Sequence, residues 1–568
     1  MTVIETDVAI VGAGPGGSTM GAFLKKYAPH LHVSIFERAI FPRDHVGESL
    51  LPIVGNILDE LGVWERIEAC GFPIKVGGTY RWGNTSDLWD FNFLPHGDLK
   101  PEPRPAQFHG QRRSTAFQVD RATYDTVLAD FASELGCDIH YGEPVRTLIR
   151  DGDRIDSLIL EGGNQVRAKY YIDATGHAGL IRRQMEVQIE EPALLRNVAV
   201  WDYWTDAEWA VQLGTGGTRI QVLSLGYGWI WFIQIGDCRT SVGFVCPAEY
   251  LRDSGLKPEE LYLKAISEEP KVSELLRDAK RENNLSTTKD WSFISTRMSG
   301  ENWLLVGESQ GFADPILSAG LTLTHTSARE AAYILMDVER GGDFAWLREQ
   351  YESRNQRRIR QHIKFADYWY TGNGNFNDLR SYVSTIASEA GLELDGEKAF
   401  QWLGTGGFIE EDMGVAGFAT LRLDQVHQIG HRLSSVPPTS SLNGYNIFVL
   451  NLKNAEEVTL AGFEMGRIHR IKALKRENRV LPLNGYFMWV IEALKHSAQL
   501  DHAIPFLAHE VQKKGISFDN AFHARITETL EAMVRDGWVK RKVMDGAPLI
   551  DHQYPTVTAS IRPNEPGR

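Results

Sequence analysis

The chain has 568 residues, of which 43% are hydrophobic and 24% are charged, which is an average composition for a folded protein. This length exceeds what one hydrophobic core supports, so we expect two or three domains. Acidic residues outnumber basic residues by 74 to 60, and the net charge is −14. Because such a surface repels phosphate backbones, we expect no nucleic-acid partner.

The cysteine pattern and the hydropathy exclude further classes. The four cysteines, at positions 70, 137, 238 and 246, show no CxxC spacing. We therefore expect reduced thiols, no disulfide framework and no metal site. No apolar run reaches the roughly 18–20 residues that cross a bilayer, and the N-terminus lacks the pattern of a signal peptide. The expectation is a cytoplasmic protein without a membrane partner.

The first forty residues predict a dinucleotide-binding βαβ unit. A buried strand at 7–11 runs directly into a GxGxxG turn, a helical pattern follows, and a second strand ends at Glu37. Gly12 allows the tight turn, Gly14 lets the backbone approach a pyrophosphate, and Gly17 allows close packing of helix and strand. The helix N-terminus favours phosphate, and Glu37 is placed to accept hydrogen bonds from ribose hydroxyls.

Two later segments favour FAD over NAD. Residues 170–176 form a strand that ends in an Asp-x-x-Gly turn at Asp173, and residues 302–308 form a strand that ends in Gly307 and Glu308. In these features the chain resembles the FAD-dependent monooxygenase superfamily, although the usual acid after the glycine is aspartate. The glycine-rich segments 214–217 and 404–407 lack the GxGxxG spacing, so we expect no NADPH site and a separate flavin reductase.

Three further segments resemble flavin-dependent halogenases. Residues 72–83 contain a K-x-G-G setting, residues 228–234 contain a W-x-W pair, and residues 312–320 contain F-x-x-P-x-x-S-x-G. Together with the Val-Gly-Glu-Ser segment 46–49, they carry the resemblance over roughly residues 1–360. It implies an enzyme that uses FADH₂ and O₂ to oxidise chloride or bromide to hypohalous acid and halogenates an electron-rich aromatic in natural-product biosynthesis.

Two departures from the family pattern are informative. Gln234 stands where the family has a proline, which questions how the segment separates flavin from substrate. Leu317 stands in the stretch where tryptophan halogenases carry a catalytic glutamate. The chain therefore looks closer to the branch that acts on phenols and pyrroles, with an acceptor that is free or bound to a carrier protein.

The resemblance assigns roles to individual residues. Lys75 is the predicted catalytic residue, which either holds hypohalous acid by hydrogen bonding or forms a haloamine; both routes stay open. Trp229 and Trp231 are predicted to form a wall between flavin and substrate. The predicted halide site is Ser318, Ala319 and Gly320, at the start of a helix over 321–335. The predicted cofactor-binding residues are Gly12, Gly14, Gly17, Glu37, Arg43, Arg121, Asp173, Gly307, Glu308 and Pro315.

The last third follows a different pattern. Residues 360–480 look mostly helical, and two later apolar helix faces precede an Asp545-Gly546 hairpin signal. The pattern suggests a winged-helix-like unit over about 482–552, within a region 361–568 that caps the substrate side. Its basic run is either a solvated helix face or a docking surface for an acidic carrier protein: Arg467, Arg470, Lys472, Lys475, Arg476 and Arg479.

The predicted fold is α/β, with a Rossmann-like FAD-binding core of the two-dinucleotide-domain type over 1–360. A substrate-side sheet is inserted at about 185–295, and a mostly helical C-terminal region follows. One alternative is an aromatic hydroxylase that consumes NADPH, which the departure at Gln234 favours. A remote alternative is a flavin-sensing DNA-binding regulator, which the winged-helix pattern suggests and the net charge opposes.

Overall fold

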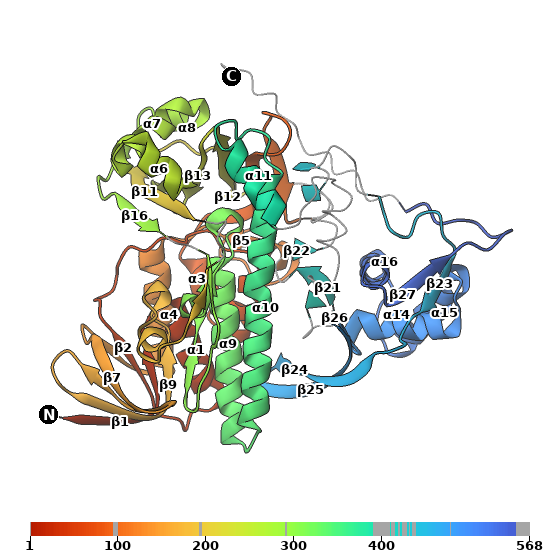
Figure 1. Cartoon of the computed structure of the whole chain (residues 1–568), viewed down its shortest axis with the longest axis horizontal. Helices are drawn as coiled ribbons and strands as arrows, with labels where there is room; N and C mark the ends of the chain where they lie inside the picture. Colours follow the sequence, from red (N-terminus) through yellow and green to blue (C-terminus); the bar gives the residue numbers. More distant parts are fainter. Residues whose placement is uncertain are drawn as a thin grey trace. The chain divides into compact units, whose positions relative to one another are not determined.

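The computed structural model of the chain describes residues 2–94, 100–191, 196–289, 292–389, 439–477 and 479–552, with short pieces between 409 and 433 (Figure 1). These residues divide into two compact units, one that ends at Ile386 and one that follows it. Among the described helices, none combines the length and the apolar character that a bilayer crossing requires. All four cysteines carry free thiols, as predicted.

The first unit begins with the predicted βαβ unit. β1 (Val3–Val11) leads into α1 (Pro15–Tyr27), and β2 (Val33–Glu37) pairs with β1 in parallel. These strands belong to a seven-stranded sheet, the parallel sheet, with the order β6-β2-β1-β9-β8-β7 and β18 paired with β9. Its other strands are β6 (Asp138–Tyr141), β7 (Val145–Asp151), β8 (Arg154–Leu160), β9 (Gln165–Asp173) and β18 (Trp303–Leu305).

The register of the parallel sheet brings three strand ends together. Val11 at the end of β1 pairs with Asp173 at the end of β9, and Asp173 also pairs with Leu305 at the end of β18. The carboxyl ends of parallel strands are where ligands bind in such sheets. The segments that leave these ends therefore surround the candidate site.

Buried helices fix the parallel sheet from one side. α1 packs against α4 (Arg121–Glu134) and α9 (Gly320–Glu339). His325 of α9 hydrogen-bonds Thr19 of α1 and Tyr124 of α4, each at 2.9 Å. Burial lowers the pKa of His325 to about 3, so the neutral ring joins the three helices. The unit also contains α2 (Pro52–Leu61), α3 (Trp64–Ala69), α5 (Leu180–Gln184), α10 (Phe344–Thr371) and most of α11 (Arg380–Glu389).

A second, nine-stranded sheet, the large sheet, has the order β15-β11-β14-β13-β12-β3-β4, with β16 paired to β11 and β5 to β3. Its strands come from two stretches of chain, so it extends beyond the predicted insertion at 185–295. They are β3 (Ile74–Arg81), β4 (Trp89–Asn92), β5 (Ala116–Phe117), β11 (Asn197–Thr205), β12 (Gly217–Leu225), β13 (Gly228–Gln234), β14 (Arg239–Pro247), β15 (Lys280–Arg281) and β16 (Ser286–Lys289).

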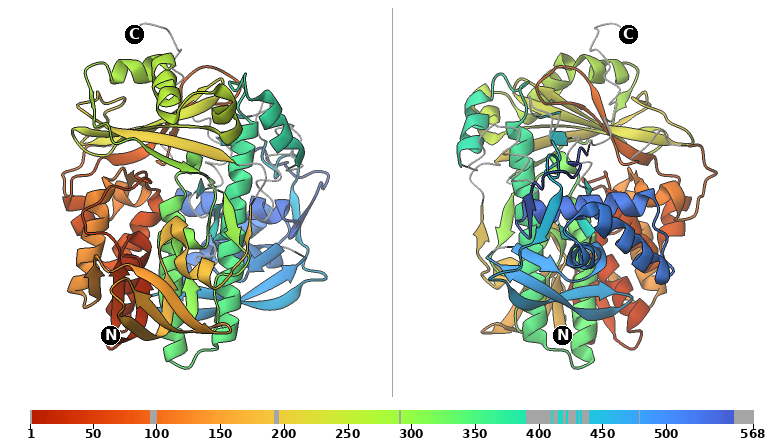
Figure 2. Two further views of the ribbon diagram at one scale, coloured as in Figure 1. Left: turned by 60° about the vertical axis from the view of Figure 1, so that its left-hand side comes forward. Right: turned by 90° about the vertical axis from the view of Figure 1, so that its right-hand side faces the viewer.

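The two faces of the large sheet differ in their neighbours. The outer face packs on α6 (Ala248–Ser254), α7 (Pro258–Glu268) and α8 (Pro270–Leu275) through a core that includes Leu223 and Ile230. Alternate residues along the same strands point to the inner face, because side chains alternate across a strand. Figure 2 shows the two sheets as separate layers, with the long helix α10 running alongside both. A small sheet, β10 (Ile189–Glu190), β17 (Phe293–Ser295) and β19 (Gly311–Phe312), completes the unit.

The second unit combines helices and strands. It contains α14 (Gly485–His496), α15 (Leu500–Lys513) and α16 (Asn520–Arg535), which share a core with Phe448 and Trp538. Its strands are β20 (Ile409–Glu410), β21 (Val415–Phe418), β22 (Leu421–Arg422), β23 (Ile447–Leu450), β24 (Glu456–Glu464), β25 (Arg467–Arg476), β26 (Arg479–Pro482) and β27 (Val539–Lys542).

Two predictions for this region are wrong. The expectation of helices up to residue 480 fails because β24, β25 and β26 form an antiparallel sheet. Met465 and Gly466 both have positive φ, and such two-residue turns produce hairpins. The expected hairpin at Asp545-Gly546 is also absent, since β27 ends at Lys542 and pairs with β23. The predicted boundary at residue 360 lies inside α10.

Candidate active site

The turn between β1 and α1 depends on glycine. Gly12 has a φ of +103°, a conformation that residues with a Cβ rarely adopt. A Cβ on Gly17 would collide with the carbonyl oxygen of Gly12, so helix and strand could not pack as they do. α1 starts at Pro15, and Gly14 as its N-cap offers no side-chain acceptor. The first N–H groups of the helix therefore have no intrahelical acceptor and suit an anion.

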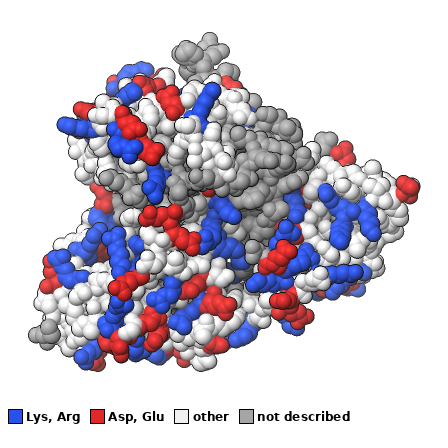
Figure 3. Space-filling view, viewed as in Figure 1, with Lys and Arg blue, Asp and Glu red and all other residues white. Residues whose placement is uncertain are grey.

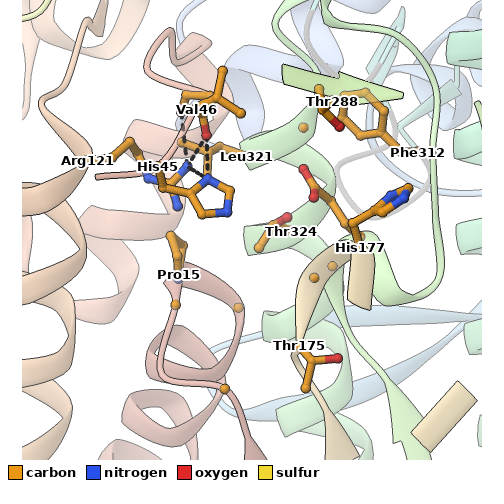
Figure 4. A pocket seen from close by; sticks show the side chains of 18 of the residues that line it. Pro15, His45, Val46, Arg121, Thr175, His177, Thr288, Phe312, Leu321 and Thr324 are labelled. Carbon is orange, nitrogen blue, oxygen red and sulfur yellow. Dashed lines mark hydrogen bonds between the residues drawn. The ribbon is translucent and has the colours of Figure 1, made fainter. Parts of the chain in front are cut away.

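A cavity of about 680 Å³ opens beside this turn (Figure 4). Its volume is in the range of small-molecule sites. Residues from the parallel sheet, the large sheet and α9 line it. Most predicted site residues are among them: Gly12, Gly14, Glu37, Arg43, Arg121, Trp229, Trp231, Gly307, Glu308, Pro315, Ser318, Ala319 and Gly320. Gly17, Asp173 and Lys75 are not part of the lining.

The Glu37 carboxylate at the end of β2 accepts two backbone hydrogen bonds. Its Oε2 accepts a hydrogen bond from Ala13 N at 2.8 Å, and its Oε1 accepts one from Ala39 N at 2.9 Å. The carboxylate thereby fixes the glycine turn. Each carboxylate oxygen has a second lone pair, so Glu37 also retains acceptors for ribose hydroxyls in the cavity.

The two predicted arginines differ in their surroundings. Arg121 is buried and donates to both carboxylate oxygens of Asp125, at 2.7 and 2.9 Å, and to Val46 O at 2.7 Å. Figure 4 shows Arg121 beside His45 and Val46 at one side of the cavity. Arg43 is more exposed and lies 3.4 Å from Asp125. Arg121 therefore holds the loop that carries Val46, whereas Arg43 is more available to a bound anion.

Asp173, a predicted cofactor-binding residue, does not line the cavity. It is fully buried, and its Oδ1 accepts hydrogen bonds from Thr175 N at 3.1 Å and Thr175 Oγ1 at 2.6 Å. Its Oδ2 accepts a hydrogen bond from Arg182 N at 2.9 Å. The carboxylate thus shapes the turn after β9. Glu308 does line the cavity, and burial raises its pKa while Arg121 opposes the shift.

A β-bulge decides which way Lys75 points. The register between β3 and β12 shifts between Thr218 and Arg219, which leaves one extra residue in Lys75–Gly77. Simple alternation from Thr79 would place Lys75 on the outer face of the large sheet, against α6–α8. The bulge re-aims the side chain to the inner face, as bulges near functional sites often do.

Gly77 and Gly78 stand at positions where a Cβ would collide with neighbouring atoms. A Cβ on Gly77 would collide with the carbonyl oxygen of Phe91 on β4. A Cβ on Gly78 would lie 2.7 Å from the ring of Tyr80. The K-x-G-G pattern therefore allows β4 to pair closely beside the bulge.

Lys75 is buried, with only 3% of its surface exposed. Its Nζ donates to Leu50 O at 3.0 Å and to Ser318 Oγ at 3.4 Å, and it lies 5.5 Å from the ring centre of Phe93. Burial lowers the pKa of Lys75 to about 7. Ammonium and neutral amine are therefore both populated near neutral pH, and both predicted chemical routes remain available to the side chain.

The contact with Ser318 joins Lys75 to the predicted halide site. Pro315–Leu317 forms a 3₁₀ turn, Ser318 follows with a φ of +56°, and α9 begins at Gly320. Ala319 is the N-cap and makes no side-chain cap. The N-terminus of α9 therefore opens toward the cavity, where its dipole and N–H groups favour an anion.

Trp229 and Trp231 form one wall of the cavity from the inner face of β13. Their ring centres lie 6.0 Å apart. Trp231 donates its Nε1–H to Ser241 Oγ at 3.1 Å. A Cβ on Gly243 would collide with the Trp231 indole, so glycine in β14 makes room for this ring.

Gln234, which replaces the proline of the family pattern, does not disturb the wall formed by Trp229 and Trp231. Gln234 is buried and does not line the cavity. Its Nε2 donates to Glu208 O at 3.1 Å, and its Oε1 accepts from Thr218 Oγ1 at 3.4 Å. The glutamine therefore anchors the end of β13 by hydrogen bonds.

Three further residues of the site were not assigned roles from the sequence. Tyr203 donates to Glu48 Oε1 at 3.0 Å, and burial raises the pKa of Glu48 to about 6. Burial and Arg121 lower the pKa of His45 to about 4. Glu48 belongs to the quoted Val-Gly-Glu-Ser segment, which offered a signal. Nothing in the sequence indicated that Tyr203 of β11 would reach it.

The lining fits a dinucleotide such as FAD. The uncapped start of α1 and the glycine turn suit a pyrophosphate, and Glu37 suits a ribose. Arg43 supplies a cation beside them. The aromatic wall of Trp229 and Trp231 suits a planar ring system.

Comparisons with known proteins show the family of this chain. Residues 7–110 and 96–378 match the family model described as tryptophan halogenase. A tryptophan 2-halogenase from Chondromyces crocatus is 33% identical over 358 residues, which span 61% of this chain and 64% of that protein. A 1H-pyrrole-2-carbonyl-(peptidyl-carrier protein) chlorinase from Pseudomonas fluorescens is 28% identical over 378 residues, which span 64% of this chain and 84% of that protein.

Solved structures show the same fold. The myxobacterial chondrochloren halogenase CndH, a variant of FAD-dependent halogenases, is 25% identical with a TM-score of 0.60, over 76% of this chain and 97% of that chain. The flavin-dependent halogenase CmlS is 23% identical with a TM-score of 0.70, over 97% of this chain and 98% of that chain. Because the family model matches more than half of the sequence, the chain belongs to the tryptophan halogenase family of flavin-dependent halogenases.

Proposed function

We propose that this protein uses FADH₂ and O₂ to oxidise chloride or bromide and halogenates an electron-rich aromatic of the phenol or pyrrole type in natural-product biosynthesis. The observation that carries this proposal is the contact of buried Lys75 with Ser318, at the helix start that opens to the cavity. Lys75 thus contacts a residue of the predicted halide site, and that residue lines the cavity that would hold the dinucleotide.

Different residues of the chain would bind the cofactor, bind the halide and transfer the halogen. Gly12, Gly14, Glu37 and Arg43 would hold FAD, which supplies the oxidation of halide by O₂ when bound. The N–H groups of Ala319 and Gly320 would bind the halide. Lys75 would hold hypohalous acid by hydrogen bonding as ammonium. As neutral amine it would form an N–halogen bond and release water.

The acceptor class is inferred from the residues and the relatives. Leu317 offers no carboxylate in the turn before Ser318. The printed name of the Pseudomonas fluorescens relative describes an enzyme that chlorinates a pyrrole on a carrier protein. The relative from Chondromyces crocatus is named for tryptophan, so tryptophan belongs in any test of the acceptor.

A separate reductase would supply FADH₂. The sequence contains a single GxGxxG turn followed by a helix, and it belongs to the cavity already described. The glycine-rich segment 214–217 forms the turn before β12. The segment 404–407 lies outside the described residues.

The position of Gln234 does not support the hydroxylase alternative. The departure at Gln234 favours it only if the change from proline alters the wall between flavin and substrate. Gln234 is anchored by Glu208 and does not line the cavity, while Trp229 and Trp231 do.

A docking surface for an acidic carrier protein finds limited support. The predicted helix face is instead the sheet of β24–β26. Arg476 and Arg479 donate to the backbone oxygens of Gly537 and Asp536 at 2.9 and 2.8 Å, so they serve packing.

The remaining basic residues of this sheet lie on β25. Arg467 and Lys475 are the cross-strand partners of Glu464 and Glu456 on β24, and acidic side chains accompany the basic ones there (Figure 3). A surface that carries charges of both signs attracts an acidic partner only weakly. We therefore propose that the acceptor is free, and we keep a carrier-bound acceptor as the second candidate.

Turnover with and without halide tests the proposal. FADH₂ from a reductase, O₂ and bromide or chloride are supplied with phenols, pyrroles, tryptophan and a carrier-bound pyrrole, and products are identified by mass. Halide-dependent product from a free phenol or pyrrole is the expected result. Oxygenated product that forms without halide would overturn it, and product from the carrier-bound form alone would reject the free acceptor.

A further inference from the structure

A buried hydrogen-bond network links the tryptophan wall to helix α10. Trp229 donates its Nε1–H to Tyr370 Oη at 3.0 Å. Tyr370 donates in turn to Asp314, with its Oη 3.1 and 3.2 Å from the two carboxylate oxygens. Asn197 of β11 donates to Asp314 Oδ2 at 3.2 Å and to Tyr370 Oη at 3.3 Å. The indole of the wall is thus fixed through residues of two other elements.

The same carboxylate also caps the turn that reaches Lys75. Asp314 Oδ1 accepts a hydrogen bond from Ile316 N at 2.9 Å, inside the 3₁₀ turn Pro315–Leu317. Ser318 follows that turn directly and accepts a hydrogen bond from Lys75 at 3.4 Å. One continuous chain of contacts therefore runs from Trp229 through Tyr370 and Asp314 to Lys75.

The network has little freedom to rearrange. Asp314 is only 1% exposed, so its carboxylate depends on the protein donors around it. Burial raises the pKa of Asp314 to about 7, and the three protein groups that donate to its side chain oppose this rise because they stabilise the carboxylate form. If the Tyr370 hydroxyl is removed, the buried Trp229 Nε1–H loses its acceptor and the carboxylate loses a donor.

We propose that Asp314 and Tyr370 are positioning residues, which hold the tryptophan wall and the Ser318 turn in one arrangement around Lys75. This inference rests on the proposed halogenase function. It assigns neither residue a contact with substrate. Their role is to keep Lys75 beside the halide site while the wall stays closed, so that oxidised halogen reaches the acceptor and is not lost to water.

The test compares conservative variants with a matched control. Tyr370→Phe and Asp314→Asn remove one link each with little change in volume. Tyr368→Phe is the control, because this neighbouring buried tyrosine of α10 has a hydroxyl with no hydrogen-bond partner in the described structure. Two quantities are measured: deuterium exchange of the backbone at 312–323, and halogenated product formed per FADH₂ consumed.

We expect both network variants to exchange faster than wild type at 312–323 and to lose product per FADH₂ by about tenfold, with unchanged flavin reoxidation. Tyr368→Phe should match wild type in both measurements. A structural role alone would lower the melting temperature without changing the yield per FADH₂.

Network variants that match Tyr368→Phe would overturn the inference while leaving the proposed function intact. If wild type itself makes no halide-dependent product, the proposed function fails. Deuterium exchange then decides whether Asp314 and Tyr370 hold the turn.

Discussion

The side-chain nitrogen of Lys75 lies 3.4 Å from the hydroxyl oxygen of Ser318, across a separation of 243 positions in the sequence. This contact joins the inner face of the large sheet to the start of α9. The fold brings the two residues together, since they are far apart in the sequence. The bulge in β3 and the 3₁₀ turn before Ser318 together produce the contact.

Burial of Lys75 predicts a pH dependence of stability. Its pKa falls from the ordinary 10.5 to about 7 in the folded protein, so between these values the unfolded chain binds the proton and the native protein does not. The free energy of unfolding therefore gains about 1.4 kcal/mol per pH unit from this residue as the pH rises from 7 toward 10. Urea unfolding of wild type and Lys75→Met at several pH values measures it.

Lys75→Met should lack this contribution, because methionine fills the same space without a proton to bind. Other titrating groups are common to both proteins and cancel in the difference. Parallel pH curves for the two proteins would show that Lys75 keeps an ordinary pKa.

Gly243 is predicted to be essential for the wall. Gly243→Ala places a methyl group against the Trp231 indole, and overpacking of this kind costs about 1–3 kcal/mol. The displaced ring should also let hypohalous acid escape, which a free halogen acceptor such as monochlorodimedone traps. Gly236→Ala is the matched control, since a Cβ there meets nothing within 4 Å. Equal stability of the two variants would contradict the packing described here.

The two cavity arginines should separate in their effects. Arg43→Met should weaken FAD affinity by about tenfold, because one charged hydrogen bond to phosphate is lost, with little change in the melting temperature of the apoprotein. Arg121→Met should lower both the FAD affinity and the melting temperature. It leaves the buried Asp125 without its bidentate partner, which lowers the free energy of unfolding by about 3–5 kcal/mol. Fluorescence titration with FAD and thermal unfolding measure the two effects. Arg252→Met, which changes only an exposed ion pair, is the control.

The sequence predicts the βαβ unit and its place beside the cavity well because the constraints on them are local. Gly12, Gly14 and Glu37 lie within one βαβ unit, where spacing alone determines contact. The place of Lys75 is harder, since alternation along β3 assigns it to the wrong face and the bulge is visible only in the register with β12. Tyr370 has no local signal, because it reaches Trp229 from a helix remote in sequence.

Two of the C-terminal predictions failed for related reasons, whereas the two predicted apolar helix faces lie on α14 and α16. The expectation of a mostly helical stretch over 360–480 fails at 456–476, because the Met465-Gly466 turn folds this stretch into a hairpin. The Asp545-Gly546 pair has the composition of a hairpin turn. β27 nevertheless pairs with the distant β23, a long-range choice that short-range turn chemistry does not reveal.

The most direct measurement is halide-dependent product formation by wild type and Lys75→Ala, with Lys271→Ala of α8 as the control outside the cavity lining. FADH₂, O₂, bromide and an accepted phenol or pyrrole are supplied, and flavin reoxidation is followed in the same samples. The account predicts that Lys75→Ala loses the brominated product while flavin reoxidation continues, and that Lys271→Ala behaves as wild type. Brominated product from Lys75→Ala at the wild-type rate would contradict it.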